Sequence, residues 1–134
     1  MFVHDTEIRV RYGETDQMGF VYYGNYALFY EVGRVEAIRA LGLTYKQLEE
    51  AGTFMPVVRV ESKFIYPAKY DDLLTIRSVV NELPDRMIHF DISIQNENKV
   101  ILHKGKVTLC FKNEEGKLVR APQVLLQKLN SYFD

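Results

Sequence analysis

The chain has 134 residues, of which 47% are hydrophobic and 26% are charged, a composition typical of one globular domain. Its formal net charge of -1 argues against a surface that binds nucleic acid or an anionic membrane. No stretch approaches the length of a membrane span, and the first residues lack the regions of a signal peptide, so we expect a cytoplasmic protein. A single cysteine, Cys110, excludes an internal disulfide and a cysteine-based zinc site.

The first part of the chain predicts one strand followed by two helices. Residues Thr6–Tyr12 alternate between apolar and charged side chains, which is the period of a strand with one buried face. A long helix should then run to Gly42, because apolar residues recur on one face at helical spacing: Tyr26, Phe29, Tyr30, Gly33, Ala37, Ala40 and Leu41. Small residues on that face favour close approach to a curved sheet. Thr44 and Gln47 have capping-box spacing and predict a short second helix that stops near Gly52.

Beyond Met55 the helical period gives way to β-branched and aromatic residues. Four more strands are predicted: Val57–Tyr66, Leu73–Val80, Met87–Asn96 and Val100–Phe111. Met87–Asn96 alternates cleanly, with an inward face formed by Ile88, Phe90, Ile92 and Ile94. The breaks between them are short, which favours antiparallel pairing, and Pro122–Phe133 predicts a closing helix. Five strands and one long helix imply a single α+β domain over residues 1–134, with the helix on one sheet face. Two copies associating edge to edge would cover the free sheet edges.

Asp16 lies in the loop between the first strand and the long helix. A carboxylate beside a helix N-terminus can act on a carbonyl that the free backbone N–H groups polarise. Short loops with an aspartate before a helix are also common turns or caps. The spacing leaves a structural and a catalytic role for Asp16 open.

Longer motifs around Asp16 carry a resemblance to a known family. The run Tyr12–Tyr26, followed by Phe29–Arg34, resembles the signature of the 4-hydroxybenzoyl-CoA thioesterase branch of the hotdog-fold acyl-CoA thioesterases. Tyr66–Ile76 resembles the turn between the second and third strands of that family. The likeness covers nearly the whole chain. It implies a hotdog fold, in which a five-stranded antiparallel sheet wraps one long central helix with short extra helices. It also implies homodimers or homotetramers with active sites at the subunit interface, an acyl-CoA substrate and no cofactor.

The resemblance also suggests roles for individual residues. Asp16 matches the catalytic aspartate, acting as a nucleophile through a mixed anhydride or as a base for water. Tyr23 stands where a backbone N–H at the helix start faces the thioester carbonyl. Related Tol-Pal-associated thioesterases tend to carry a histidine there, so a histidine-assisted mechanism is not implied. Tyr12 and Glu31 also fall on family-like positions: Tyr12 is a core aromatic or a substrate contact, and Glu31 is a hydrogen-bonded structural carboxylate or a second group of the site.

Two further residues are candidates for substrate binding. Arg86 follows a turn, near the position at which the hydroxybenzoyl branch has a short basic cluster. By this resemblance, Arg86 is expected to contact a CoA phosphate. Tyr26, with Tyr22, Tyr23 and Phe29, would accept an aromatic or a short to medium aliphatic acyl group. No metal site is expected, because two candidate ligands such as His89 and Asp91 do not make one.

The residue types present favour carboxylate chemistry. There is no Gly-x-Ser-x-Gly elbow, and His4, His89 and His103 are scattered, so serine and cysteine triads lack their parts. We therefore expect a metal-free acyl-CoA thioesterase. The alternatives are a non-catalytic module that binds acyl thioesters, a thioesterase acting on acyl-carrier protein, and a dehydratase, which would need a histidine that Arg11–Leu41 lacks.

Overall fold

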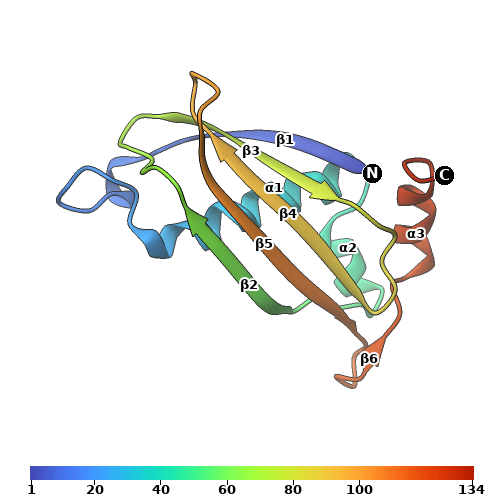
Figure 1. The fold of residues 1–134 in the computed structure, drawn as a ribbon. Coiled ribbons are helices and arrows are strands. Elements are labelled where there is room, and N and C mark those ends of the chain that lie inside the picture. The colour runs from blue at the N-terminus through green and yellow to red at the C-terminus, as the bar shows by residue number, and fades with distance from the viewer.

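A computed structural model describes all 134 residues as one antiparallel sheet with a long helix across one face (Figure 1). The strands are β1 (Phe2–Arg9), β2 (Val57–Phe64), β3 (Leu73–Val80), β4 (Met87–Gln95), β5 (Ile101–Lys112) and β6 (Leu118–Val119). The helices are α1 (Tyr26–Ala40), α2 (Tyr45–Glu50) and α3 (Gln123–Asn130), with short 3-10 turns at Tyr12–Glu14 and Tyr23–Asn25. The strand order is β1-β3-β4-β5-β2, and β6 pairs with β5.

The core lies between α1 and the sheet. The predicted inward face of β4 is confirmed, because Ile88, Phe90, Ile92 and Ile94 are all buried. Gly42, with a φ of +90°, ends α1 as predicted, and the Leu43 N–H donates to the Ile38 carbonyl (3.3 Å) beyond it. The predicted hotdog arrangement of a sheet and one central helix is confirmed. None of the helices combines the length and apolar character needed to cross a bilayer.

Several details differ from the sequence prediction, and β2 and α3 are shorter than expected. The first strand is Phe2–Arg9 rather than Thr6–Tyr12, because the chain pairs with β3 from its second residue and turns away after Val10. Ala40 is exposed at the end of α1, where Ile38 and Leu41 complete the buried stripe. Arg34 is buried on the helix face that was expected to be apolar. A sixth strand, β6, exists because the turn before it folds the chain back onto β5.

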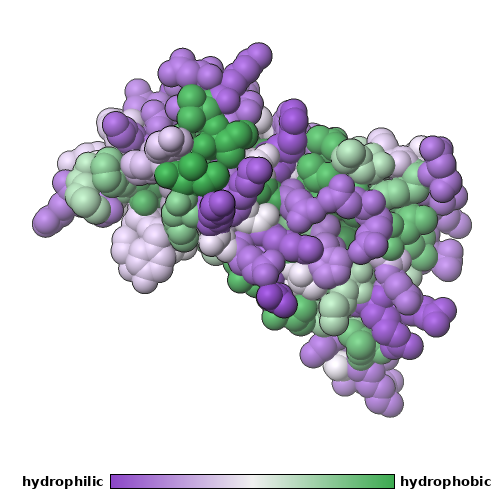
Figure 2. Space-filling view, in the orientation of Figure 1, coloured by the Kyte–Doolittle hydropathy of each residue, from purple (hydrophilic) through white to green (hydrophobic).

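β2 forms one edge of the sheet and is exposed along its whole length. Its outer face carries Arg59, Glu61 and Lys63, and the outer face of the sheet is largely hydrophilic (Figure 2). The alternate positions carry apolar side chains, among them Val60 (48% exposed) and Phe64 (54% exposed). A single chain therefore leaves one apolar strand edge uncovered, beside the site described next.

Candidate active site

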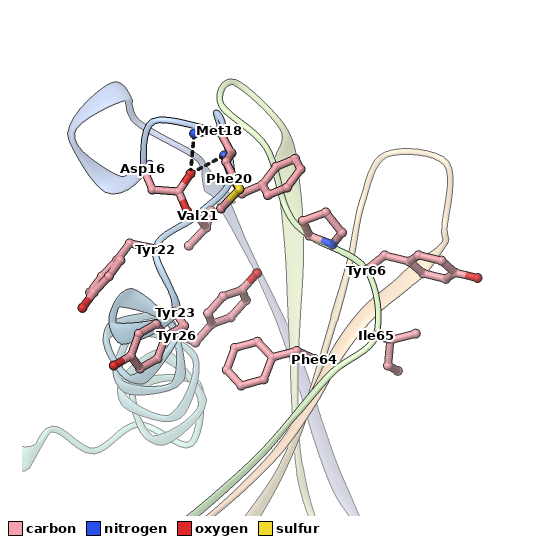
Figure 3. Close-up of a pocket in the computed structure, with 11 residues that line it drawn as sticks. Asp16, Met18, Phe20, Val21, Tyr22, Tyr23, Tyr26, Phe64, Ile65 and Tyr66 are labelled. Carbon is pink, nitrogen blue, oxygen red and sulfur yellow. Dashed lines mark hydrogen bonds between the residues drawn. The ribbon is translucent and has the colours of Figure 1, made fainter.

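Asp16 lies at the centre of a tight loop between β1 and α1. One of its carboxylate oxygens, Oδ1, accepts hydrogen bonds from the backbone N–H groups of Met18 (2.9 Å) and Phe20 (3.2 Å), drawn as dashed lines in Figure 3. The Phe20 carbonyl accepts a bond from the Asp16 N–H (2.8 Å), and Gly19 supplies the positive φ of +79° that the turn requires. The other oxygen, Oδ2, accepts no hydrogen bond from the protein. Asp16 thus has a structural role through one oxygen and leaves the other free for chemistry.

The carboxylate borders an apolar cavity of about 560 Å³. Its walls come from the Asp16 loop, the start of α1, and the end of β2 with the segment after it (Figure 3). The lining residues are Asp16, Met18, Phe20, Val21, Tyr22, Tyr23, Tyr26, Phe64, Ile65, Tyr66 and Pro67. Asp16 is the one charged residue among them. The cavity can therefore hold an apolar group next to a single reactive carboxylate.

The turn before α1 carries free backbone donors beside the same cavity, which Tyr23 lines. The 3-10 turn Tyr23–Asn25 leads directly into α1, and the N–H groups of Tyr23 and Gly24 donate no hydrogen bond within the protein. The side-chain amide of Asn25 donates to the Glu14 carbonyl (2.8 Å), which ties this turn to the chain just before Asp16. Unpaired N–H groups at the positive end of a helix stabilise negative charge on a nearby oxygen.

Tyr26 forms the buried inner wall of the cavity. Burial raises the pKa of its phenol, and the N–H of Ala68 donates to the phenol oxygen (3.4 Å), which acts in the opposite direction. The Tyr26 ring meets Phe64 edge to face, with 5.2 Å between centroids. The wall is therefore aromatic and uncharged at neutral pH.

The cavity unites three of the six candidate residues. Asp16, Tyr23 and Tyr26 line it, whereas Tyr12, Glu31 and Arg86 do not. Tyr12 is 80% exposed and contacts Tyr70 edge to face, so the expectation that it is a core aromatic is wrong. The side chain of Glu31 is exposed on α1 and makes no hydrogen bond, so its expected structural bond is absent.

Arg86 lies at the opposite end of the sheet within one chain. Phe64 pairs with His103, and Met87 pairs with Cys110 further along the same strand. At about 3.3 Å per residue, this separation is about 23 Å. An arginine so placed does not reach the cavity of its own chain.

Several lining residues were not singled out from the sequence. Met18, Phe20 and Val21 belong to the Asp16 loop, whereas Phe64 ends β2 and Ile65–Pro67 follow it. The available signal was the run Phe64-Ile65-Tyr66, where apolar residues continue past the alternating part of the strand. The Phe20 backbone bridges to Lys69, and the Val21 N–H donates to the Ala68 carbonyl (2.8 Å). These long-range contacts bring the two segments together.

Comparisons with known proteins agree with this fold. Residues 10–129 match the thioesterase-like superfamily. YneP of Bacillus subtilis, by name a candidate acyl-CoA thioesterase, is 39% identical over 82 residues, which cover 61% of this chain and 59% of the relative. YbgC of Haemophilus influenzae, named an acyl-CoA thioesterase, is 34% identical over 104 residues, which cover 77% of this chain and 76% of the relative.

A solved structure extends the similarity to nearly every residue. The DHNA-CoA thioesterase from Staphylococcus aureus aligns with a TM-score of 0.85 and 29% identity, covering 99% of this chain and 85% of its own. The names of the relatives agree with the predicted enzyme class, a thioester hydrolase. Because the family match extends over residues 10–129, the chain belongs to the thioesterase-like superfamily, as its resemblance to the hotdog thioesterases predicted.

Proposed function

We propose that this protein hydrolyses acyl-CoA thioesters to free CoA and a carboxylic acid, with Asp16 as the acting carboxylate. The observation that carries the proposal is the free Oδ2 of Asp16 at the edge of an apolar cavity that Tyr23, whose backbone N–H is unpaired, also lines. The names of the relatives support the substrate class.

The reaction requires few groups. Either Asp16 takes a proton from water as the water oxygen attacks the thioester carbon, or Asp16 attacks that carbon itself and water then hydrolyses the anhydride. In both routes negative charge develops on the carbonyl oxygen and the thiolate of CoA leaves. The N–H groups of Tyr23 and Gly24 are the proposed donors to that oxygen.

The cavity favours an apolar acyl group. Aromatic and aliphatic side chains form nearly all of its lining, so burial of a short to medium alkyl chain or an aromatic ring would supply binding free energy. A charged acyl terminus would be desolvated there without a partner.

The active unit in this proposal is a dimer in which the β2 edges of two copies meet. β2 has an unpaired edge and uncovered apolar side chains, which a second copy would bury. Because the cavity is lined by Phe64 at the end of β2 and by Ile65–Pro67 directly after it, the partner would lie beside each site. A CoA phosphate contact for Arg86, which lies far from the cavity of its own chain, would then come from the partner.

The test compares wild type with Asp16→Asn on acyl-CoAs from acetyl to palmitoyl, with benzoyl-CoA, by release of free thiol. Asparagine keeps the Oδ1 acceptor for Met18 and Phe20, so the loop is preserved and the negative charge is lost. We expect the kcat of Asp16→Asn to fall by about a hundredfold or more. Glu82→Gln, at an exposed turn residue, is the matched control and should retain full activity.

Two outcomes would contradict the proposal. An Asp16→Asn variant as active as wild type would remove the carboxylate from the mechanism. Binding of acyl-CoA by wild type without turnover would favour the non-catalytic binding module. Octanoyl-CoA and octanoyl-acyl-carrier protein, assayed side by side, would identify the carrier.

A further inference from the structure

His103 of β5 lies directly behind the aromatic wall of the cavity and is fully buried, with 0% of its surface exposed. Its imidazole stacks on the ring of Tyr26, with 4.2 Å between centroids and 12° between planes. It also meets Phe64 edge to face at 4.7 Å and 79°. Tyr26 and Phe64 both line the cavity, so His103 supports two wall residues from behind without lining it.

Hydrogen bonds fix the orientation of the imidazole. Its Nε2 is bonded to the hydroxyl of Tyr30 on α1, and the same hydroxyl is bonded to Ser62 Oγ on β2 (2.7 Å). The network therefore joins α1, β2 and β5 beneath the cavity. Rotation of the imidazole about the stacking direction would break its bond to Tyr30.

The backbone of β5 makes room for this network at Gly105. A Cβ atom at position 105 would lie 2.5 Å from Tyr30 Cζ and 3.0 Å from Tyr30 Cε1. Any larger residue would displace the Tyr30 ring and its hydroxyl. The position of Tyr30 thus depends on a glycine two residues from His103.

Histidine at position 103 lowers the stability of the fold in one respect that an apolar residue would avoid. The second imidazole nitrogen, Nδ1, is buried and has no hydrogen-bond partner. A buried polar atom without a partner is destabilising. Phenylalanine would stack on Tyr26 without that cost, but it could not bond to Tyr30. The hydrogen bond is the property that distinguishes histidine at this position.

We propose that His103 is a positioning residue, which holds Tyr26 and Phe64 as a fixed wall of the acyl cavity and so sets the affinity for longer acyl groups. This inference rests on the proposed function of the cavity as an acyl site. A short acyl group next to Asp16 does not depend on the inner wall, whereas a longer chain packs against it. The effect of His103 therefore grows with acyl length.

The test measures binding of two thioethers that cannot be hydrolysed, S-methyl-CoA and S-octyl-CoA, by calorimetry. For His103→Leu, which removes the stacked ring, we expect the Kd of S-octyl-CoA to rise by about threefold to tenfold. His103→Phe and Tyr30→Phe both lose the bond between residues 103 and 30 and keep both rings. They should show smaller increases that resemble each other. The Kd of S-methyl-CoA should remain unchanged in all three.

His89→Leu is the matched control, because His89 bonds to Thr108 on β5 and lies outside the cavity. His89→Leu should change the affinity for neither S-methyl-CoA nor S-octyl-CoA.

The outcomes separate this inference from the proposed function. Unchanged binding of S-octyl-CoA in His103→Leu, or equal weakening of the binding of both thioethers, would overturn the inference and leave the proposed function intact. If wild type binds S-octyl-CoA as expected but does not hydrolyse octanoyl-CoA, the proposed function fails and the positioning role of His103 stands. If wild type binds neither thioether, the proposed function and the role of His103 are both wrong.

Discussion

Gly33 of α1 lies directly against Ile76 of β3: a Cβ atom at position 33 would be 2.7 Å from Ile76 Cγ2. The same atom would be 2.8 Å from Ser78 Oγ. Real Cβ atoms do not come this close to their neighbours. The close approach of α1 to the sheet therefore depends on the absence of a side chain at position 33, as the small residues on that helix face predicted.

Gly33→Ala should destabilise the protein. Overpacking costs about 1–3 kcal/mol, which exceeds the gain of up to about 1 kcal/mol from better helix propensity. The urea midpoint is expected to fall. Gly13→Ala, where no atom lies within 4 Å of the added Cβ, is the control and should change the free energy of unfolding by no more than about 0.5 kcal/mol. A Gly33→Ala variant as stable as wild type would show that the helix moves away at little cost.

Tyr23→Pro tests the proposed backbone donor. Proline removes the N–H of residue 23, and the first position of a helical turn tolerates it. The kcat is expected to fall by about a hundredfold, the scale of losing one oxyanion donor. Tyr23→Ala keeps the N–H and should change KM more than kcat. Equal kcat values for the two variants would exclude this N–H as the donor.

His103 makes stability depend on pH. Burial lowers the pKa of His103 from 6.5 to about 4, so the folded protein holds the imidazole neutral. The unfolded chain binds a proton more readily between these values, and stability therefore rises with pH in that window. The contribution of neutral His103 to the free energy of unfolding is complete above pH 6.5. It is lost as pH falls towards 4, by up to about 3 kcal/mol.

Urea unfolding of wild type and His103→Phe at a series of pH values measures this contribution. Wild type should lose more stability than His103→Phe between neutral and mildly acidic pH. Parallel curves for the two proteins would mean that His103 titrates normally in the folded state.

Val60→Lys tests the proposed pairing of β2 edges. A lysine at an apolar, half-exposed position of an edge strand opposes burial against a second copy. Sedimentation should show wild type as a dimer or larger and Val60→Lys shifted towards monomer, with a parallel loss of activity. Val100→Lys, at an exposed valine between β4 and β5, is the control and should leave assembly unchanged. A monomeric, active wild type would contradict the dimer.

Local pattern was sufficient for most of the fold. The alternation of Ile88, Phe90, Ile92 and Ile94 identified the inward face of β4, and the helical spacing up to Gly42 identified α1. These patterns succeed because the period of apolar side chains reflects backbone geometry directly. The first strand was misplaced since its bounds depend on pairing with β3, which lies about seventy residues away in the chain.

The candidate site also has residues that local sequence indicated and residues that only the tertiary structure identified. The motif around Asp16 pointed to Asp16, Tyr23 and Tyr26, which come from one continuous segment. Only the tertiary structure placed Phe64–Pro67 opposite that segment and His103 behind it, because contacts between distant strands decide both. Sequence determined which faces are buried and indicated the residues proposed to carry the chemistry. Packing decided which distant side chains form the remaining walls, since residues far apart in a chain meet only through the sheet that joins them.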